Sequence, residues 1–227
     1  MEVRLLSFTQ NAERICAAAA NGCYSESPSF EIINSLTGDG VERIIKKVTD
    51  SGHLSVIEHA SFTFSVSGVS RALSHQLVRH RLASYSQQSM RYVNFEKLNY
   101  VTPPSVAGDP SKKEVFEMAM RIVEDTYKNL IKKGIKPEDA RFILPEGSQT
   151  ALTLTMNARE LLHFFRLRCC TTAQWEIRAL ADEMLRQCKE VCPVIFRNAG
   201  PSCVSEGYCT EGEKSCGRAP LLKRAND

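Results

Sequence analysis

The sequence predicts an α+β fold, in which several helices pack on a small sheet and helix outweighs strand. Two kinds of segment support this prediction: stretches with apolar residues at helical spacing, and two short stretches in which apolar and polar residues alternate. They follow one another without the regular strand–helix–strand order of a parallel α/β fold. At 227 residues, the chain is expected to form one domain over residues 1–200, followed by a Cys- and Gly-rich tail over residues 201–227.

Two helices and a strand are expected before Ser70. Alanine density predicts a helix over residues 12–20. A second helix, ended by Gly52, is predicted where apolar residues recur at i, i+3, i+4 and i+7, namely at Val41, Ile44, Ile45 and Val48. A half-buried strand is predicted where apolar residues alternate with serine and threonine before Gly68, namely at Phe62, Phe64 and Val66.

The next helix is expected over residues 70–81, with Ser70 as its N-cap. Leu73 and Leu77 would form its buried face. The polar residues on or beside the opposite face would then emerge where the helix meets a loop, and these residues are Gln76, Arg79 and His80.

Three further helices and a second strand are expected in the rest of the chain. A long helix ended by Gly134 is marked by Val115, Met118, Ile122, Leu130 and Ile131. A strand over residues 150–156 alternates threonine with Leu152, Leu154 and Met156. Asn157 and Glu160 form an expected N-cap and capping box for a helix that runs to Arg168. The last helix, from about Ala173 to Cys192, carries a core stripe of Ile177, Leu180, Met184, Cys188 and Val191.

A run without acidic residues lies between Glu58 and Glu96, and it is the part of the chain best suited to hold an anion. Arginine side chains offer planar donor forks that fit phosphate, while serine and glutamine side chains add neutral hydrogen bonds. The net charge is only +3, so this positive charge is local and favours a small anionic ligand over nucleic acid. The residues concerned are Arg71, Arg79, Arg81, Ser84, Ser86, Gln87, Gln88, Ser89 and Arg91.

Neither GxGxxG nor GxxxxGK(S/T) occurs in the sequence, so any nucleotide must be held by side chains. An alternative function is a non-enzymatic module that binds RNA or DNA through the basic run, with Tyr85 and Tyr92 as stacking groups. A metal site at His53, Glu58 and His59 is not expected, because their spacing matches neither HExxH nor HxxEH.

The nine cysteines are odd in number and spread along the chain, which favours reduced thiols over a disulfide framework. In one alternative, Cys169 or Cys170 is a nucleophile, because the preceding Arg166 and Arg168 would lower a thiol pKa. In another, a metal such as zinc fastens the tail, although no CxxC pair is present. Its ligands would be Cys192, Cys203, Cys209 and Cys216.

The chain is expected to be cytoplasmic, without a membrane or nucleic-acid partner. Its first residues turn polar before a secretory apolar core can form. No apolar run approaches the roughly 20 residues that a membrane-spanning helix needs.

The basic run contains Arg79-His80-Arg81, then seven residues, then Ser89 and Arg91-Tyr92. This pattern resembles the signature of the flavin-dependent thymidylate synthases, the thymidylate synthase complementing protein family, which methylate dUMP using FAD. Further blocks similar to the family occur in the same order over most of residues 45–195. These blocks are Gly52-His53 with Ser55, Glu58-His59 before a Phe-rich strand, Asn157-Ala158-Arg159, Leu167-Arg168 and Ala173-Gln174-Trp175-Glu176-Ile177.

The resemblance implies a small antiparallel sheet with helices, assembled as a homotetramer whose active sites draw residues from several subunits. It also implies reductive methylation of dUMP to dTMP, with methylenetetrahydrofolate as one-carbon donor, FAD as redox cofactor and NADPH as reductant. No enzyme cysteine would take part. Arg168 is the expected catalytic residue, because its guanidinium would stabilise negative charge as N3 of the uracil ring ionises and C5 becomes nucleophilic.

Ligand contacts are carried over from the family by position. Contacts to dUMP are expected from Gln76, Arg79, Gln87, Ser89, Arg91 and Arg168. Contacts to FAD are expected from His53, Ser55, Arg79, His80, Arg81, Gln87, Asn157, Arg159 and His163. No metal is expected among these residues.

Three positions depart from the common family pattern. Ala151 stands where a basic residue is common, Gln87 where an acid is common and His163 where asparagine is common. The first change removes a possible phosphate contact and the second removes a charge beside the nucleotide. The third replaces an amide by an imidazole, which can still form hydrogen bonds.

Overall fold

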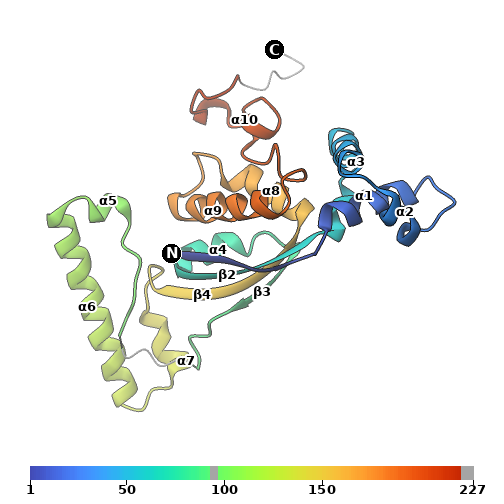
Figure 1. The fold of residues 1–227 in the computed structure, drawn as a ribbon. Helices are drawn as coiled ribbons and strands as arrows, with labels where there is room; N and C mark the ends of the chain where they lie inside the picture. The colour runs from blue at the N-terminus through green and yellow to red at the C-terminus, as the bar shows by residue number, and fades with distance from the viewer. Residues whose placement is uncertain (93–96, 221–227) are drawn as a thin grey trace. The chain divides into compact units, whose positions relative to one another are not determined.

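A small antiparallel sheet in the order β1-β2-β4-β3 is surrounded by a larger amount of helix in the computed structural model, which describes residues 1–92 and 97–220 (Figure 1). The α+β class is therefore confirmed. The strands are β1 (Glu2–Phe8), β2 (Ser61–Ser70), β3 (Ala83–Gln87) and β4 (Gln149–Asn157). The helices are α1 (Ala12–Gly22), α2 (Ser29–Ser35), α3 (Gly38–Asp50), η1 (Leu54–His59), α4 (Arg71–Leu77), α5 (Pro104–Ala107), α6 (Pro110–Lys132), α7 (Pro137–Ala140), η2 (Arg141–Ile143), α8 (Ala158–Arg168), α9 (Trp175–Val191), α10 (Ser202–Ser205) and η3 (Gly212–Lys214).

The described chain separates into two compact units, each discontinuous in sequence. Unit 1 comprises Met1–Glu2, Val66–Arg79 and Tyr85–Thr153. Unit 2 comprises Val3–Ser65, His80–Ser84 and the chain from Leu154 onward. All four strands therefore give residues to both units.

Unit 2 has an aromatic core. Every second residue of β2 points into it, so that Phe62 and Phe64 are fully buried. The ring of Phe196 meets that of Phe62 edge-on, with centroids 5.3 Å apart, and it meets Phe165 of α8 at 6.0 Å. Helix α8 also packs on α9 (Figure 1). This packing fixes α8, the helix that carries several of the predicted site residues.

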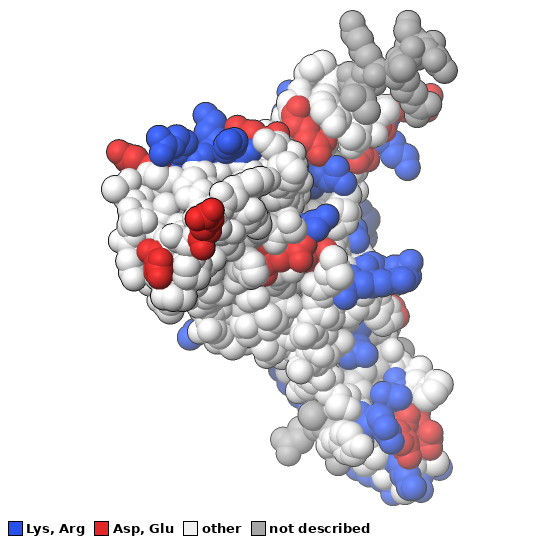
Figure 2. All heavy atoms as spheres, turned by 90° about the vertical axis from the view of Figure 1, so that its right-hand side faces the viewer, with Lys and Arg blue, Asp and Glu red and all other residues white. Residues whose placement is uncertain are grey.

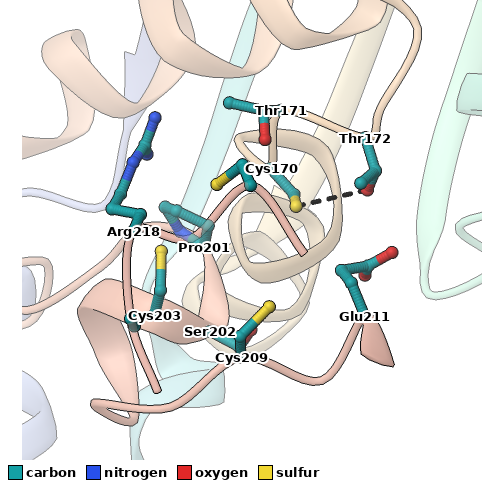
Figure 3. A pocket seen from close by; sticks show the side chains of 11 residues that line it. Cys170, Thr171, Thr172, Pro201, Ser202, Cys203, Cys209, Glu211 and Arg218 are labelled. Atoms are coloured by element: carbon teal, nitrogen blue, oxygen red, sulfur yellow. Dashed lines mark hydrogen bonds between the residues drawn. The ribbon is translucent and has the colours of Figure 1, made fainter. Parts of the chain in front are cut away.

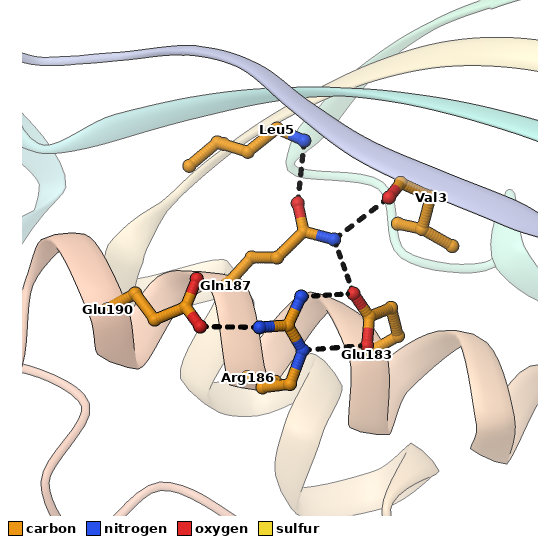
Figure 4. Close-up of polar contacts among 6 residues, drawn as sticks. All are labelled: Val3, Leu5, Glu183, Arg186, Gln187 and Glu190. Atoms are coloured by element: carbon orange, nitrogen blue, oxygen red, sulfur yellow. Dashed lines mark hydrogen bonds and ion pairs between the residues drawn. The ribbon is translucent and has the colours of Figure 1, made fainter.

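Strand β1 is attached to α9 through one buried amide, Gln187 (Figure 4). The backbone N–H of Leu5 donates to Oε1 of Gln187 at 2.7 Å, and Nε2 of Gln187 donates to the carbonyl of Val3 at 2.9 Å. Nε2 also donates to Glu183 at 2.7 Å, and Glu183 in turn pairs with Arg186. The amide thus satisfies backbone groups on the strand that a simple apolar contact would leave unpaired.

Helix α4 of unit 1 begins where it was expected but ends earlier. Oγ of Ser70 caps it by accepting the N–H of Leu73 at 3.0 Å, and Leu73 and Leu77 are buried as predicted. The helix ends at Leu77 instead of Arg81. Tyr85, in β3, donates its hydroxyl to the carbonyl of Leu77 at 2.9 Å. The chain after Leu77 makes a short turn and then forms strand β3, where a loop was expected.

Helix α6 confirms the predicted long helix, but three of the five apolar residues that marked it in the sequence are exposed. Val115, Met118 and Ile122 are 63%, 50% and 61% exposed, whereas Met120 and Tyr127 are buried. Because α6 packs on α5, α7 and η2 through its other side, the stripe of Val115, Met118 and Ile122 faces solvent in the single chain. We call these three residues the α6 stripe.

The surface shown in Figure 2 carries basic and acidic side chains interspersed, instead of one continuous basic area. That mixture agrees with the net charge of +3. Across the described residues, no helix combines the length and the apolar character that crossing a bilayer requires.

Candidate functional site

Three polar side chains of unit 2 form a hydrogen-bonded line. The ring of His80 lies between Glu160, in the first turn of α8, and Arg168, at the end of α8. Nδ1 of His80 is 3.0 Å from Oε1 of Glu160, and Nε of Arg168 donates to Nε2 of His80 at 3.1 Å. Because Arg168 donates to Nε2, the ring proton must be on Nδ1, where it is donated to Glu160.

Burial keeps the His80 ring neutral. His80 is 4% exposed and Glu160 is 6% exposed. Desolvation lowers the pKa of His80 below its usual 6.5, although the hydrogen bond to Glu160 acts in the opposite direction. Burial also lowers the pKa of Arg168, whose guanidinium nevertheless stays charged. The line therefore runs from an anion through a neutral ring to a cation.

The prediction that His80 projects from the polar face of a helix is wrong. Helix α4 ends before it, so the ring turns inward and packs edge-on against Phe164, with centroids 4.9 Å apart. The role of Glu160 was also missed. Asn157 does cap α8, since its Oδ1 accepts the Glu160 N–H at 2.9 Å, but the Glu160 carboxylate bonds to His80 instead of completing a capping box.

An open cavity of about 750 Å³ lies beside this line in unit 2. One face of α8 contributes Arg159, His163 and Arg166, which follow one another at i, i+4 and i+7. Apolar walls come from Leu54, Leu82, Leu162, Val194 and Ile195. A cavity of this size, with apolar walls and a few convergent polar groups, is typical of a site for a small organic molecule.

Sequence reasoning found Arg159 and His163 but missed two other parts of this cavity. Arg166 was considered only as a neighbour of cysteines, although its helical spacing from Arg159 was a usable signal. The stretch from Val194 to Gly200 also lines the cavity. No pattern in the sequence indicates that stretch, because only the packing of unit 2 brings it beside α8.

The arginines of this cavity are held by exposed ion pairs. Arg159 pairs with Glu58 at 2.6 Å and Arg166 pairs with Glu206 at 3.0 Å. Arg197, which also lines the cavity, pairs with Glu42 at 2.9 Å. Exposed pairs of this kind contribute only about 0–1 kcal/mol each, so an incoming phosphate can replace the carboxylate at small cost.

Unit 2 also contains the remaining residues predicted to contact FAD, apart from two. His53 and Ser55 are exposed next to the cavity-lining Leu54, and Arg81 is exposed beside the buried His80. Asn157 is half-buried at the start of α8. The two exceptions, Arg79 and Gln87, belong to unit 1.

Unit 1 holds the residues predicted to contact dUMP, except Arg168. Arg79 is exposed, and its side chain makes no hydrogen bond or ion pair with the part of the chain that the structure describes. Arg91 pairs with Glu138 at 3.0 Å, and the Arg91 N–H donates to Oγ of Ser89 at 3.2 Å. Gln87, in β3, donates from Nε2 to a threonine hydroxyl of β4 at 3.2 Å, and Gln76 is half-buried on α4.

The structure does not place the cysteines as the two alternative hypotheses, a cysteine nucleophile and a zinc site in the tail, require. Cys169 is buried, and desolvation with nearby Asp182 raises its pKa, which is opposite to the direction expected for a nucleophile. Cys192 is buried in the core, where burial raises its pKa to about 12. It does not line the small cavity where the other three proposed metal ligands, Cys203, Cys209 and Cys216, are found.

One group in the described chain has the right residues and spacing for a metal ion, namely His80, Glu160 and His163, whose ligand atoms lie within 4.8 Å of one another. Both ring nitrogens of His80 are already used, one by Glu160 and one by Arg168. A metal on His80 would have to displace one of these partners. The geometry therefore fits a hydrogen-bonded cluster that orients Arg168.

Comparison with known proteins shows the family of the chain. The profile described as thymidylate synthase complementing protein matches residues 4–194. The chain belongs to this family. Flavin-dependent thymidylate synthases of Geobacter sulfurreducens and Clostridium tetani are 51% and 44% identical to it, each alignment covering 99% of this chain and 97% or 96% of the relative.

The fold also has a counterpart of known structure. The UMP/dUMP methylase PolB from Streptomyces cacaoi, in a crystal structure with bound 5-Br dUMP, superposes with a TM-score of 0.73. The superposition covers 86% of this chain and 93% of that one, at 24% sequence identity. At this identity the likeness shows a shared fold.

Proposed function

We propose that this chain converts dUMP to dTMP by reductive methylation, with FAD as redox cofactor, methylenetetrahydrofolate as one-carbon donor and NADPH as reductant. Relatives named flavin-dependent thymidylate synthase, and a structural neighbour that is a UMP/dUMP methylase, support a flavin and a pyrimidine nucleotide. The observation that carries the proposal is the line from Glu160 through His80 to Arg168. These hydrogen bonds hold the guanidinium of Arg168, the residue expected to act on the uracil ring, in one orientation.

The residues around the 750 Å³ cavity fit a flavin dinucleotide. Arginine side chains suit its pyrophosphate, and apolar walls suit its ring system. The proposed contacts are His53, Ser55, Arg79, His80, Arg81, Gln87, Asn157, Arg159 and His163. When bound, FAD supplies hydride transfer and carriage of a one-carbon unit, which no side chain can provide.

His80 would contribute to this site mainly by its position, since both of its ring nitrogens have protein partners. Arg159 and Arg166 would exchange an exposed carboxylate for a phosphate oxygen. Such an exchange gains a charge-assisted, potentially bidentate bond.

For dUMP, we propose that Arg79, Ser89 and Arg91 hold the phosphate and that Gln76 and Gln87 orient the nucleoside. Arg79 offers a guanidinium that the described residues leave without a side-chain partner. Arg91 would exchange its exposed pair with Glu138 for the phosphate. With Ala151 in place of a basic residue, the positive charge among the proposed dUMP phosphate contacts comes from these two arginines.

Arg168 is the proposed catalytic residue. Its charge would stabilise the uracil ring as N3 loses its proton, which raises electron density at C5 and makes that carbon the nucleophile. The acceptor on His80 binds Nε of Arg168, which fixes the plane of the guanidinium group. This scheme requires no cysteine nucleophile, and the raised pKa of Cys169 agrees with that.

The active enzyme is proposed to be a cytoplasmic homotetramer that shares its active sites between subunits. The exposed α6 stripe of Val115, Met118 and Ile122 supports an assembly, because solvent-facing apolar side chains at helical spacing form a surface that another subunit can cover.

One preparation tests the proposal. The protein is purified without added cofactor, its visible spectrum is recorded, and NADPH oxidation is followed with and without dUMP. A flavin spectrum and dUMP-stimulated oxidation are expected. A colourless protein that oxidises no NADPH even after addition of FAD would contradict the proposal.

A further inference from the structure

Four of the nine cysteines meet around one small cavity of unit 2. Cys170 follows helix α8, whereas Cys203, Cys209 and Cys216 come from the tail. All four line a cavity of about 10 Å³. In Figure 3 the sulfur atoms of Cys170, Cys203 and Cys209 point toward the same space. None of the four is in a disulfide.

Two of these sulfurs accept hydrogen bonds from the protein. The hydroxyl of Thr172 donates to Sγ of Cys170 at 3.2 Å. Sγ of Cys216 accepts hydrogen bonds from the Thr171 side chain and from the backbone N–H of Arg218. The Arg218 side chain also lines the cavity with its positive charge. Hydrogen bonds and a cation of this kind stabilise sulfur in the charged form that coordinates metals.

The tail has little else to hold it in place. Between Ser202 and Pro220 the buried residues are Ser202 and Cys209 alone, and the regular structure is limited to the short helices α10 and η3. Its backbone is tied locally, for example by the Cys209 N–H donating to the carbonyl of Pro220 at 2.7 Å. A segment with so small an apolar core is typically stabilised by a disulfide or a metal.

We propose that Cys170, Cys203, Cys209 and Cys216 bind one Zn²⁺ ion, which fastens the tail to the loop after α8. Four cysteine ligands form a standard closed structural zinc site. Each thiol gives its proton to solvent as its sulfur binds, so the site releases up to four protons per ion. A cavity that holds about one water-sized atom suits a single ion, whereas an iron–sulfur cluster needs a larger space.

Coordination requires the four side chains to close around the ion. In a zinc tetrahedron with Zn–S bonds of about 2.3 Å, the sulfurs are about 3.8 Å apart. Among the described residues, no three of the four sulfurs lie within 4.8 Å of one another. Rotation about the Cα–Cβ bonds of Cys203 and Cys216, which are only partly buried or exposed, can bring them together.

The site differs from the set expected from the sequence, because Cys170 replaces Cys192. Cys170 was treated there only as a possible nucleophile. Its role here has a structural consequence, since it lies two residues after Arg168, and a metal at Cys170 restrains the end of α8.

The direct test is the metal content of the purified full-length protein, measured by inductively coupled plasma mass spectrometry after expression with added Zn²⁺ and gel filtration. About one zinc ion per chain is expected for the wild type. Cys203→Ser and Cys216→Ser are each expected to lose most of it. Cys23→Ser is the matched control, because Cys23 is exposed far from the cavity in sequence and its only sulfur contact is with the Ala19 carbonyl. Zinc-free wild type, or equal zinc in the three variants, would overturn the proposal.

A second measurement covers variants that fail to fold, since it uses the wild-type chain alone. Zinc is removed with a chelator and Co²⁺ is added, and the absorption bands of tetrahedral thiolate-bound cobalt are expected. Circular dichroism checks that the fold survives removal. The absence of these bands, or disulfides among the four cysteines found by mass spectrometry of the freshly purified protein, would overturn the site. Neither readout depends on FAD, dUMP or enzymatic activity.

Discussion

Glu160 is a buried anion that reaches the proposed catalytic group only through another side chain. Its carboxylate accepts the Nδ1 proton of His80, which leaves Nε2 as the acceptor for Arg168. If this acceptor were lost, the neutral ring could present a donor to the guanidinium and release it. Glu160 is therefore a positioning residue in this account.

Replacing Glu160 tests that role. Glu160→Ala is expected to lower kcat about 100-fold with a smaller change in KM for dUMP, because a misplaced Arg168 loses transition-state stabilisation more than binding. Glu160→Gln keeps an acceptor for Nδ1–H and should recover much of the rate. Steady-state kinetics would measure both variants, with the exposed Glu190→Ala as a control. Equal kcat in Glu160→Ala and the wild type would contradict the role.

The neutral state of His80 predicts a dependence on pH. Its folded-state pKa is lowered below 6.5, so its contribution to stability is present above the unfolded-state value and is lost as pH falls through the folded value. A protonated ring also cannot accept from Arg168, so kcat should fall over the same acidic range. Melting temperature and kcat would be measured from about pH 5 to 8. His80→Gln, which cannot be protonated, should lack this dependence of stability, and an unchanged slope would contradict the assignment.

The sequence predicted the residues that belong to family motifs, but it did not predict the buried hydrogen bonds between them. Arg168, Arg159 and His163 follow from motif position, and the structure brings the latter two to one cavity. The buried line could not be predicted, because Glu160 and His80 are far apart in sequence and meet only through packing. The ligand contacts themselves stay predictions.

Strand β1 is the main element that sequence reasoning missed. Its residues Val3 to Phe8 lack clean alternation, and the strand is half-exposed at an edge of the sheet. Its stability depends on Gln187, a polar residue of α9 that no periodic pattern selects. By contrast, β4 and most of β2 alternate buried with partly buried residues, and both strands were predicted.

The Gln187 bridge can be tested by one substitution. Gln187→Leu keeps the volume but leaves backbone groups of Val3 and Leu5 without a partner, so the free energy of unfolding should fall by about 1–3 kcal/mol. Urea denaturation of the two proteins measures the difference. Arg186→Leu, which removes the exposed ion pairs with Glu183 and Glu190 on the same helix, should cost less than about 1 kcal/mol. Equal stability of Gln187→Leu and the wild type would show that the bridge contributes nothing.

The α6 stripe bears on the assembly. The periodic spacing of apolar residues predicted the helix correctly. Such spacing indicates that the apolar face is buried, but it does not indicate by what. In the single chain, none of the described residues buries the α6 stripe. The sequence therefore could not distinguish a core helix from an interface helix. Whether residues 1–200 form one folding domain also stays a prediction.

Charges on this stripe should break the proposed tetramer. Met118→Lys together with Ile122→Lys places two cations on the apolar surface, which a partner subunit could not bury without a large desolvation cost. Sedimentation velocity should show a tetramer for the wild type and smaller species for the double variant. Circular dichroism controls for folding. A tetramer that survives both substitutions would place the interface elsewhere.

The claim on which the account depends most is that Arg168 drives methylation of dUMP without an enzyme thiol. The most direct measurement is dTMP formation from dUMP, methylenetetrahydrofolate, NADPH and FAD, followed by mass spectrometry for the wild type, Arg168→Ala and Cys169→Ala. We expect Arg168→Ala to form dTMP at least about 100-fold more slowly than the wild type while still binding flavin. We expect folded Cys169→Ala to keep the wild-type rate. Normal dTMP formation by Arg168→Ala, or loss of it in a folded Cys169→Ala protein, would contradict the account.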